Sequence, residues 1–184
     1  MMTESDTIAS AAGPPGVIAL VALAVAAGAV SCTSPREGYS PEQPIAYSHE
    51  LHAGQLKMDC RYCHFEADYG RHAGIPSTAI CMNCHSGVGK DKDGVIKLTK
   101  YWDEKRSIPW VKVHDLPDFV YFDHSRHLAK GFECERCHGK IEEMVQVATV
   151  HAFNMGWCVG CHRNPEQPDD PTLRGSTDCH TCHR

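Results

Sequence analysis

One pattern, Cys-x-x-Cys-His, occurs five times in this chain, as Cys60-Arg-Tyr-Cys63-His64, Cys81-Met-Asn-Cys84-His85, Cys134-Glu-Arg-Cys137-His138, Cys158-Val-Gly-Cys161-His162 and Cys179-His-Thr-Cys182-His183. These copies use ten of the 11 cysteines. Two thiols one helical turn apart can add to the two vinyl groups of a porphyrin, and the next residue can offer its imidazole to the iron. The pattern therefore predicts five covalently bound c-type haems, with His64, His85, His138, His162 and His183 as proximal ligands.

Other uses of paired cysteines fit the spacing poorly. Zinc sites do not need a histidine directly after every pair, and neither disulfides nor thioredoxin-like redox pairs explain 13 histidines among 184 residues. The net charge of −5 gives no basic surface for nucleic acid. With 42% hydrophobic and 22% charged residues, the composition is that of a folded protein.

The N-terminal region contains a long uncharged segment between Asp6 and Arg36. A helix over residues 15–34 would have about 20 residues and span about 30 Å, enough to cross a bilayer. The alternative is a cleaved lipoprotein signal with Cys32 as the lipidated residue, but no Lys or Arg precedes the apolar run. We predict a tail (1–14), a single transmembrane helix (15–34), a polar linker (35–46) and a haem domain (47–184).

The haem domain shows little sustained period of 2 or 3.6 and many Gly and Pro residues. Such a sequence could hardly bury a conventional core, so porphyrins must fill it. The predicted fold class is mainly irregular with short α-helices, a multihaem cytochrome c domain built around five stacked haems. Haem attachment requires export, which places this domain on the periplasmic side of the cytoplasmic membrane.

An internal repeat divides the haem domain. Tyr47-Ser-His49-Glu-Leu-His52 precedes the first motif as Phe122-Asp-His124-Ser-Arg-His127 precedes the third. The first and third motifs are 74 residues apart and the second and fourth 77. This spacing predicts two-haem units over about 47–121 and 122–170, with a fifth haem over about 171–184.

The aromatic-x-His-x-x-His segment resembles that of class III multihaem cytochromes, in which both imidazoles are distal ligands of different haems. This resemblance implies that His49, His52, His124 and His127 are distal ligands. For the fifth iron we favour Met144, because a thioether raises the potential of one haem relative to bis-His ligation. Ligation by His114 or His151 is the alternative, and Met155 and His72 are weaker candidates.

A longer stretch, from Ile108-Pro-Trp110 through Pro117-Asp-Phe-Val-Tyr121 to Asn154-Met155-Gly-Trp157, resembles the pentahaem membrane subunit of bacterial alternative complex III. The resemblance implies an electron-transfer subunit of a membrane quinol-oxidising complex. Its partners would be an iron–sulfur and molybdopterin-enzyme-like subunit, polytopic quinol-binding subunits and a monohaem cytochrome, with a periplasmic electron acceptor.

Two other functions fit the sequence less well. A periplasmic pentahaem shuttle to a terminal reductase would not need the membrane helix. A haem enzyme needs a five-coordinate iron, often marked by a departure from the attachment motif, and all five motifs are regular. We expect no substrate chemistry on this chain.

Overall fold

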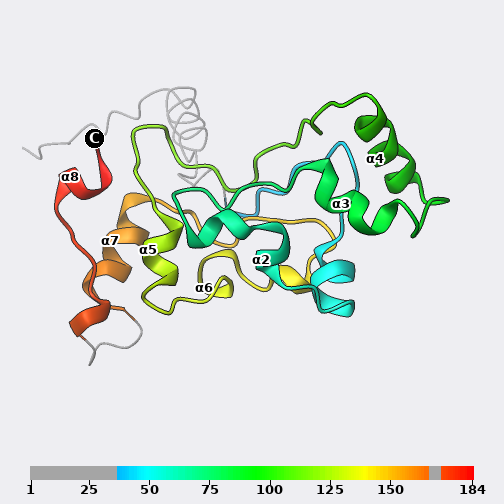
Figure 1. Cartoon of the computed structure of the whole chain (residues 1–184). Coiled ribbons are helices and arrows are strands. Elements are labelled where there is room, and N and C mark those ends of the chain that lie inside the picture. The colour runs from blue at the N-terminus through cyan, green and yellow to red at the C-terminus, as the bar shows by residue number, and fades with distance from the viewer. Residues whose placement is uncertain (1–36, 166–170) are drawn as a thin grey trace, which may run out of the picture. The chain divides into compact units, whose positions relative to one another are not determined.

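The computed structural model describes residues 37–165 and 171–184, and the chain divides into two units, Met1–Thr33 and Ser34–Arg184. All described residues lie in the second unit. Their helices, shown in Figure 1, are η1 (Glu50–Gln55), α2 (Cys60–Cys63), η2 (Phe65–Asp68), α3 (Thr78–His85), α4 (Asp93–Asp103), α5 (His124–Leu128), α6 (Glu135–His138), η3 (Ile141–Glu143), α7 (Met155–Arg163), η4 (Pro171–Leu173) and α8 (Cys179–Cys182).

The expected architecture of short helices in an irregular chain is confirmed for these residues. The only β-type pairing among them is an isolated antiparallel bridge between Val120 and His183. No helix in residues 37–165 or 171–184 is long and apolar enough to cross a membrane. The predicted transmembrane helix, 15–34, and the alternative lipidation residue Cys32 lie outside the described residues.

The attachment motifs form short helices because a polar side chain caps several of them. Asp59 accepts a hydrogen bond from the backbone N–H of Arg61 (2.7 Å) at the start of α2. Asp178 does the same for His180 (2.9 Å) in α8, and Asn154 for Trp157 (2.9 Å) in α7. Such caps satisfy free N–H groups at a helix start. Each turn then places both thiols on one side of the helix.

The apolar core of the described residues is small. Its buried members are Ile45, Leu98 and Ile108, with Tyr101 and Trp110 packed against them. This cluster lies beside α3 and α4, so it supports only the second attachment motif. Elsewhere no large side chain of the described residues is fully buried. The deficit of side-chain packing agrees with the expectation that cofactors complete the interior.

The two aromatic-x-His-x-x-His segments have nearly identical ring geometry. Tyr47 stacks on His52 (4.5 Å between centroids, 21°) and meets His49 edge-on (4.8 Å, 84°). Phe122 stacks on its second histidine, His127 (4.5 Å, 29°), and meets the first edge-on (4.8 Å, 88°). The sequence repeat is therefore also a repeat in three dimensions.

Candidate haem centres

Each histidine of the two repeated segments lies opposite the histidine of an attachment motif. The ring centroids of His49 and His64 are 6.4 Å apart, and those of His52 and His85 are 6.1 Å apart. In the second repeat, His124 and His138 are 6.2 Å apart, and His127 and His162 are 6.0 Å apart. Four pairs from different parts of the chain thus share one spacing.

This spacing is the one that two imidazoles bound to a single metal would have. A metal–nitrogen bond of about 2 Å puts each ring centroid about 3 Å from the metal, so a pair sharing one iron has centroids about 6 Å apart. Rotation of each ring about its metal–nitrogen axis leaves this distance unchanged, so the range of interplanar angles, 4° to 66°, is compatible with it.

Backbone carbonyls fix which nitrogen of these rings faces the partner ring. The Nδ1–H groups donate to carbonyl oxygens in seven of the nine histidines predicted as ligands: His52 to Ser48, His64 to Gly74, His85 to Val88, His124 to Arg71, His127 to Asp123, His162 to Ser176 and His183 to Phe119, at 2.6–3.3 Å. A carbonyl can only accept, so Nδ1 is protonated and Nε2 is free to bind a metal.

Gly74 shows how closely one of these carbonyls is positioned. Its φ is +75°, and a Cβ atom there would lie 2.7 Å from Oε2 of Glu66. Only glycine adopts this turn without strain and leaves that space open. The turn directs the Gly74 carbonyl to Nδ1 of His64, 2.7 Å away.

Burial keeps several of these imidazoles neutral, the form that binds iron. Burial lowers the pKa of His49 to about 4, and the nearby His64 and His52 rings lower it further. Burial also lowers the pKa of His138 to about 3, with added repulsion from neighbouring histidines, His114 first among them. The pKa of His127 is likewise lowered by burial.

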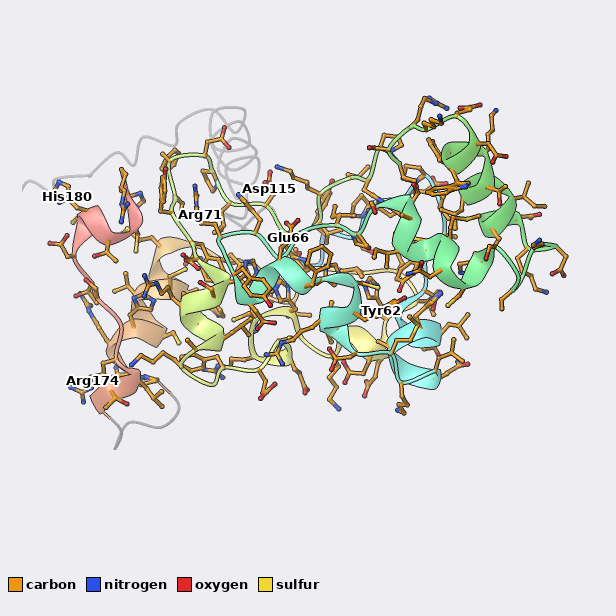
Figure 2. The ribbon with its side chains drawn as sticks, viewed as in Figure 1. Tyr62, Glu66, Arg71, Asp115, Arg174 and His180 are labelled. Carbon is orange, nitrogen blue, oxygen red and sulfur yellow. The ribbon has the colours of Figure 1, made fainter. Side chains whose placement is uncertain are left out.

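Three buried nitrogen atoms have no hydrogen-bond partner among the described residues: His49 Nδ1, Arg71 Nε and His114 Nε2. The Arg71 guanidinium also lies 3.7 Å from the centroid of the Tyr121 ring, and Figure 2 labels it within the haem domain. Buried polar atoms without partners indicate a missing group. Haem propionates would supply acceptors, so these donors and the paired imidazoles fit the predicted cofactor.

The fifth motif differs from the other four. Its histidine, His183, donates from Nδ1 to the Phe119 carbonyl (3.3 Å) and packs against the Phe119 ring (5.9 Å). In the part of the chain that the structure describes, no second imidazole is paired with His183 as in the other four motifs. Met144, the predicted ligand for this iron, has its carbonyl hydrogen-bonded by Glu50 N–H (2.9 Å) in η1. These contacts do not support Met144 opposite His183, and its role stays a prediction.

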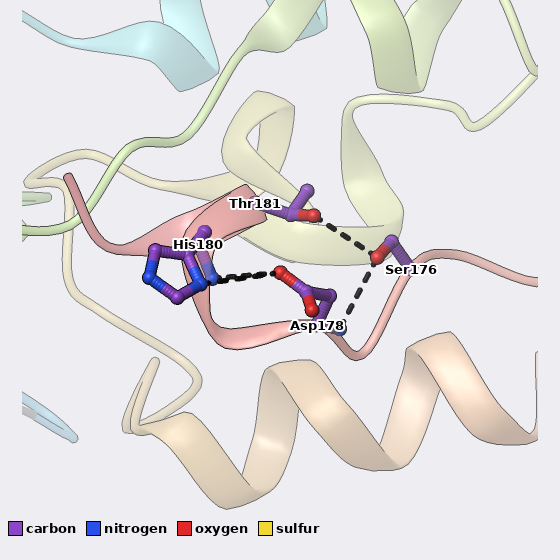
Figure 3. A network of polar contacts seen from close by, with 4 residues as sticks. All are labelled: Ser176, Asp178, His180 and Thr181. Atoms are coloured by element: carbon purple, nitrogen blue, oxygen red, sulfur yellow. Dashed lines mark hydrogen bonds and ion pairs between the residues drawn. The ribbon is translucent and has the colours of Figure 1, made fainter.

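The remaining histidines occupy different environments. His72 is exposed, and His114 packs edge-on against His138 (4.4 Å). His151 lies against Trp157 (5.0 Å), directly before the fourth motif. His180, inside the fifth motif, is 93% exposed beside Asp178, in the small network with Ser176 and Thr181 shown in Figure 3.

Sequence patterns did not reveal the carbonyl acceptors or the role of Arg71. Backbone acceptors have no residue-type signal, because any residue offers a carbonyl. Arg71 stands seven residues beyond the end of the first motif, with nothing in its neighbours to mark it as functional. Glycines at positions 70 and 74 are the local signals of a turn.

Comparison with known proteins agrees with this geometry. Residues 120–184 match the family described as cytochrome c7 and related cytochrome c. Over 164 residues, 78% of this chain and 77% of the relative, the sequence is 29% identical to the menaquinone reductase multiheme cytochrome c subunit of Nitratidesulfovibrio vulgaris (strain Hildenborough). Neither match names alternative complex III, so that assignment stays a prediction. By these matches and its repeated motifs, the chain is similar to multihaem cytochromes c, a class of proteins with covalently bound haem.

Proposed function

We propose that this chain carries five c-type haems and is the electron-transfer subunit of a membrane quinone-linked complex. The observation that carries the proposal is the set of four histidine pairs with one common spacing of 6.0–6.4 Å. Each pair joins a motif histidine to a histidine from a repeated segment. Bis-imidazole iron cycles between ferric and ferrous states, which is the chemistry that the haems supply.

The chain's own residues hold the ligands and limit solvent access. Protonated Nδ1 atoms on backbone carbonyls hold seven of the nine predicted ligand rings in one orientation. Tyr47 and Phe122 each lie over one distal imidazole and against the edge of another, so one aromatic ring supports two centres. The two imidazoles of each of these four pairs would hold one haem iron between them, which would suit these sites to electron transfer and leave no position for a substrate.

For the fifth iron, His183 would be the proximal ligand, and the candidates for the sixth ligand are Met144 and, for all-histidine ligation, His114 or His151; His114 packs against His138 of the third motif (4.4 Å). Met144 is the sequence-based choice, but its segment packs against η1. His151 packs against Trp157, and the next residue, Cys158, has a thiol close enough to that of Cys182 to raise its pKa. On this link between the fourth and fifth motifs we propose His151 as the sixth ligand, which would make all five centres bis-histidine.

The wider setting of the proposal follows the family resemblance. A helix over 15–34 would anchor the chain in the cytoplasmic membrane with the haem domain on the periplasmic side. Partner subunits would include an iron–sulfur and molybdopterin-like protein, polytopic quinol-binding proteins and a monohaem cytochrome, as in alternative complex III. Electrons from quinol would leave towards a periplasmic acceptor.

A second candidate reverses the direction of flow. The matched relative is named a subunit of a menaquinone reductase, in which electrons reach the quinone instead of leaving it. Purification in mild detergent followed by two assays separates the candidates. Quinol-dependent haem reduction supports the first, whereas quinone-dependent oxidation of the prereduced haems, with no quinol-dependent reduction, supports the second. Haems that respond to neither quinol nor quinone in the intact complex would refute both.

A further inference from the structure

Contacts between different attachment motifs reveal how the motifs follow one another in space. The first and second are neighbours: burial raises the pKa of the Cys63 thiol, and the nearby Cys81 thiol raises it further. Tyr47 is close enough to both thiols for each to raise its pKa. Asn83, in the second motif, also donates from Nδ2 to the hydroxyl of Tyr62 in the first (3.1 Å).

The first motif also touches the third, which is 74 residues away in the sequence. The Cys60 thiol is a hydrogen-bonding neighbour of the Cys134 thiol, and after burial it is the main cause of the raised pKa of Cys134. The proximal imidazoles agree, because His64 is among the rings that lower the pKa of His138. Backbone contacts bring the same regions together, since Ser125 N–H donates to the Gly70 carbonyl (3.2 Å).

The third, fourth and fifth motifs continue the series. The third and fourth motifs are joined through α5, because His124 lies opposite His138 (6.2 Å) and His127 lies opposite His162 (6.0 Å). Burial raises the pKa of the Cys158 thiol, and the nearby Cys182 thiol raises it further. The link between the fourth and fifth motifs also appears in the backbone, where Gly175 N–H donates to the His162 carbonyl (3.1 Å).

We propose that the five haems, whose presence rests on the function proposed above, lie in the spatial order second, first, third, fourth, fifth. Each thiol becomes the bond to a porphyrin edge, so motifs that lie side by side place two porphyrin edges side by side. Compared with the order of the motifs in the sequence, only the first and second haems exchange places. The haem of the first motif lies inside the row, and the haem of the second motif lies at its end. Figure 1 shows the motif helices in the same succession, α3, α2, α6, α7 and α8.

This order assigns the two ends of the electron path. One end would be the haem on His85, whose attachment residue Cys81 packs against the apolar cluster beside α3 and α4. The other would be the haem on His183, directly after α8, where Cys179 and Arg184 are exposed. Electrons that traverse the whole row enter at one of these haems and leave at the other.

Two variants of one segment test the order. His49→Gly removes the distal imidazole directly before η1, and His52→Gly removes the one within that helix. These changes should make the iron on His64 or on His85, respectively, high-spin while the haem stays covalently attached. A high-spin ferric iron accelerates the electron-spin relaxation of adjacent low-spin haems, so pulsed EPR counts its neighbours. The proposal predicts two accelerated low-spin haems in His49→Gly and one in His52→Gly.

If the haems instead followed the order of the motifs in the sequence, His49→Gly would show one accelerated low-spin haem and His52→Gly would show two. That result would overturn the proposal. Each variant is a sufficient test by itself. Two accelerated low-spin haems in His52→Gly, for example, would show that the haem on His85 does not lie at an end of the row. Intact mass shows whether each variant keeps its haems, and added imidazole should restore the low-spin signal. A wild-type protein with fewer than five haems would instead refute the proposed function, so the two failures are distinguishable.

Discussion

Gly175 offers a sharp test of how the fourth haem centre is built. A Cβ atom at this position would lie 2.5 Å from Cγ and 2.6 Å from Nδ1 of His162. The ring cannot move aside freely, because its Nδ1 donates to the Ser176 carbonyl at 2.6 Å. Gly175→Ala must therefore displace the proximal imidazole or the segment before the fifth motif.

The expected cost combines two effects. Overpacking typically costs about 1–3 kcal/mol, and loss of the Ser176 hydrogen bond adds about 1 kcal/mol. A total of about 2–4 kcal/mol corresponds to a fall in Tm of about 5–15 °C for a chain of this size. Resonance Raman spectra should also show one of the haems with an altered iron–imidazole bond.

Gly160→Ala is the matched control, since a Cβ atom at Gly160 meets nothing within 4 Å. Gly160 lies in α7, and alanine is favoured over glycine in a helix by about 1 kcal/mol, so this variant should be as stable as the wild type or slightly more so. If Gly175→Ala matched the control in both Tm and Raman spectrum, the described position of His162 would be wrong.

Three further predictions concern ligation, packing and metal content. His151→Ala should make the fifth haem high-spin, whereas Met144→Ala should leave the spin states unchanged; loss of a thioether–iron absorption band in Met144→Ala would restore the sequence-based choice. Gly54→Ala should lower stability by about 1–3 kcal/mol, because a Cβ atom at this position would meet the Glu142 carbonyl. Gly70→Ala is its control and should keep the wild-type stability, because a Cβ atom at Gly70 meets nothing within 4 Å. Equal melting curves for the two variants would contradict this packing. Treatment with a chelator should change neither the absorption spectrum nor Tm, because thioether bonds retain the cofactor, whereas unfolding on chelation would indicate structural zinc.

The sequence was informative wherever covalent chemistry imposes a fixed local spacing. The attachment motifs and the two repeated segments could be predicted from their spacing. One haem needs two thiols one helical turn apart and a histidine directly after them. The irregular fold also followed, since the residues beyond Arg36 lack the apolar periodicity of a conventional core. The short capped helices agree with that expectation.

Long-range pairing could not be predicted from spacing alone. Which of His49 and His52 lies opposite His64 depends on how η1 packs against α2, which the spacing of the residues does not determine. Met144 illustrates the same limit, because its favourable chemistry says nothing about where the segment after α6 packs. In the structure that segment lies against η1.

The central claim is that five haems are bound covalently through the five motifs. The most direct measurement is the intact mass of the purified protein, combined with the haem content per polypeptide from its reduced pyridine spectrum. The account predicts a mass increase of five haem groups that survives denaturation and acid extraction, with five haems per chain. A mass equal to that of the polypeptide alone, or haem that is removed by acid extraction, would contradict it.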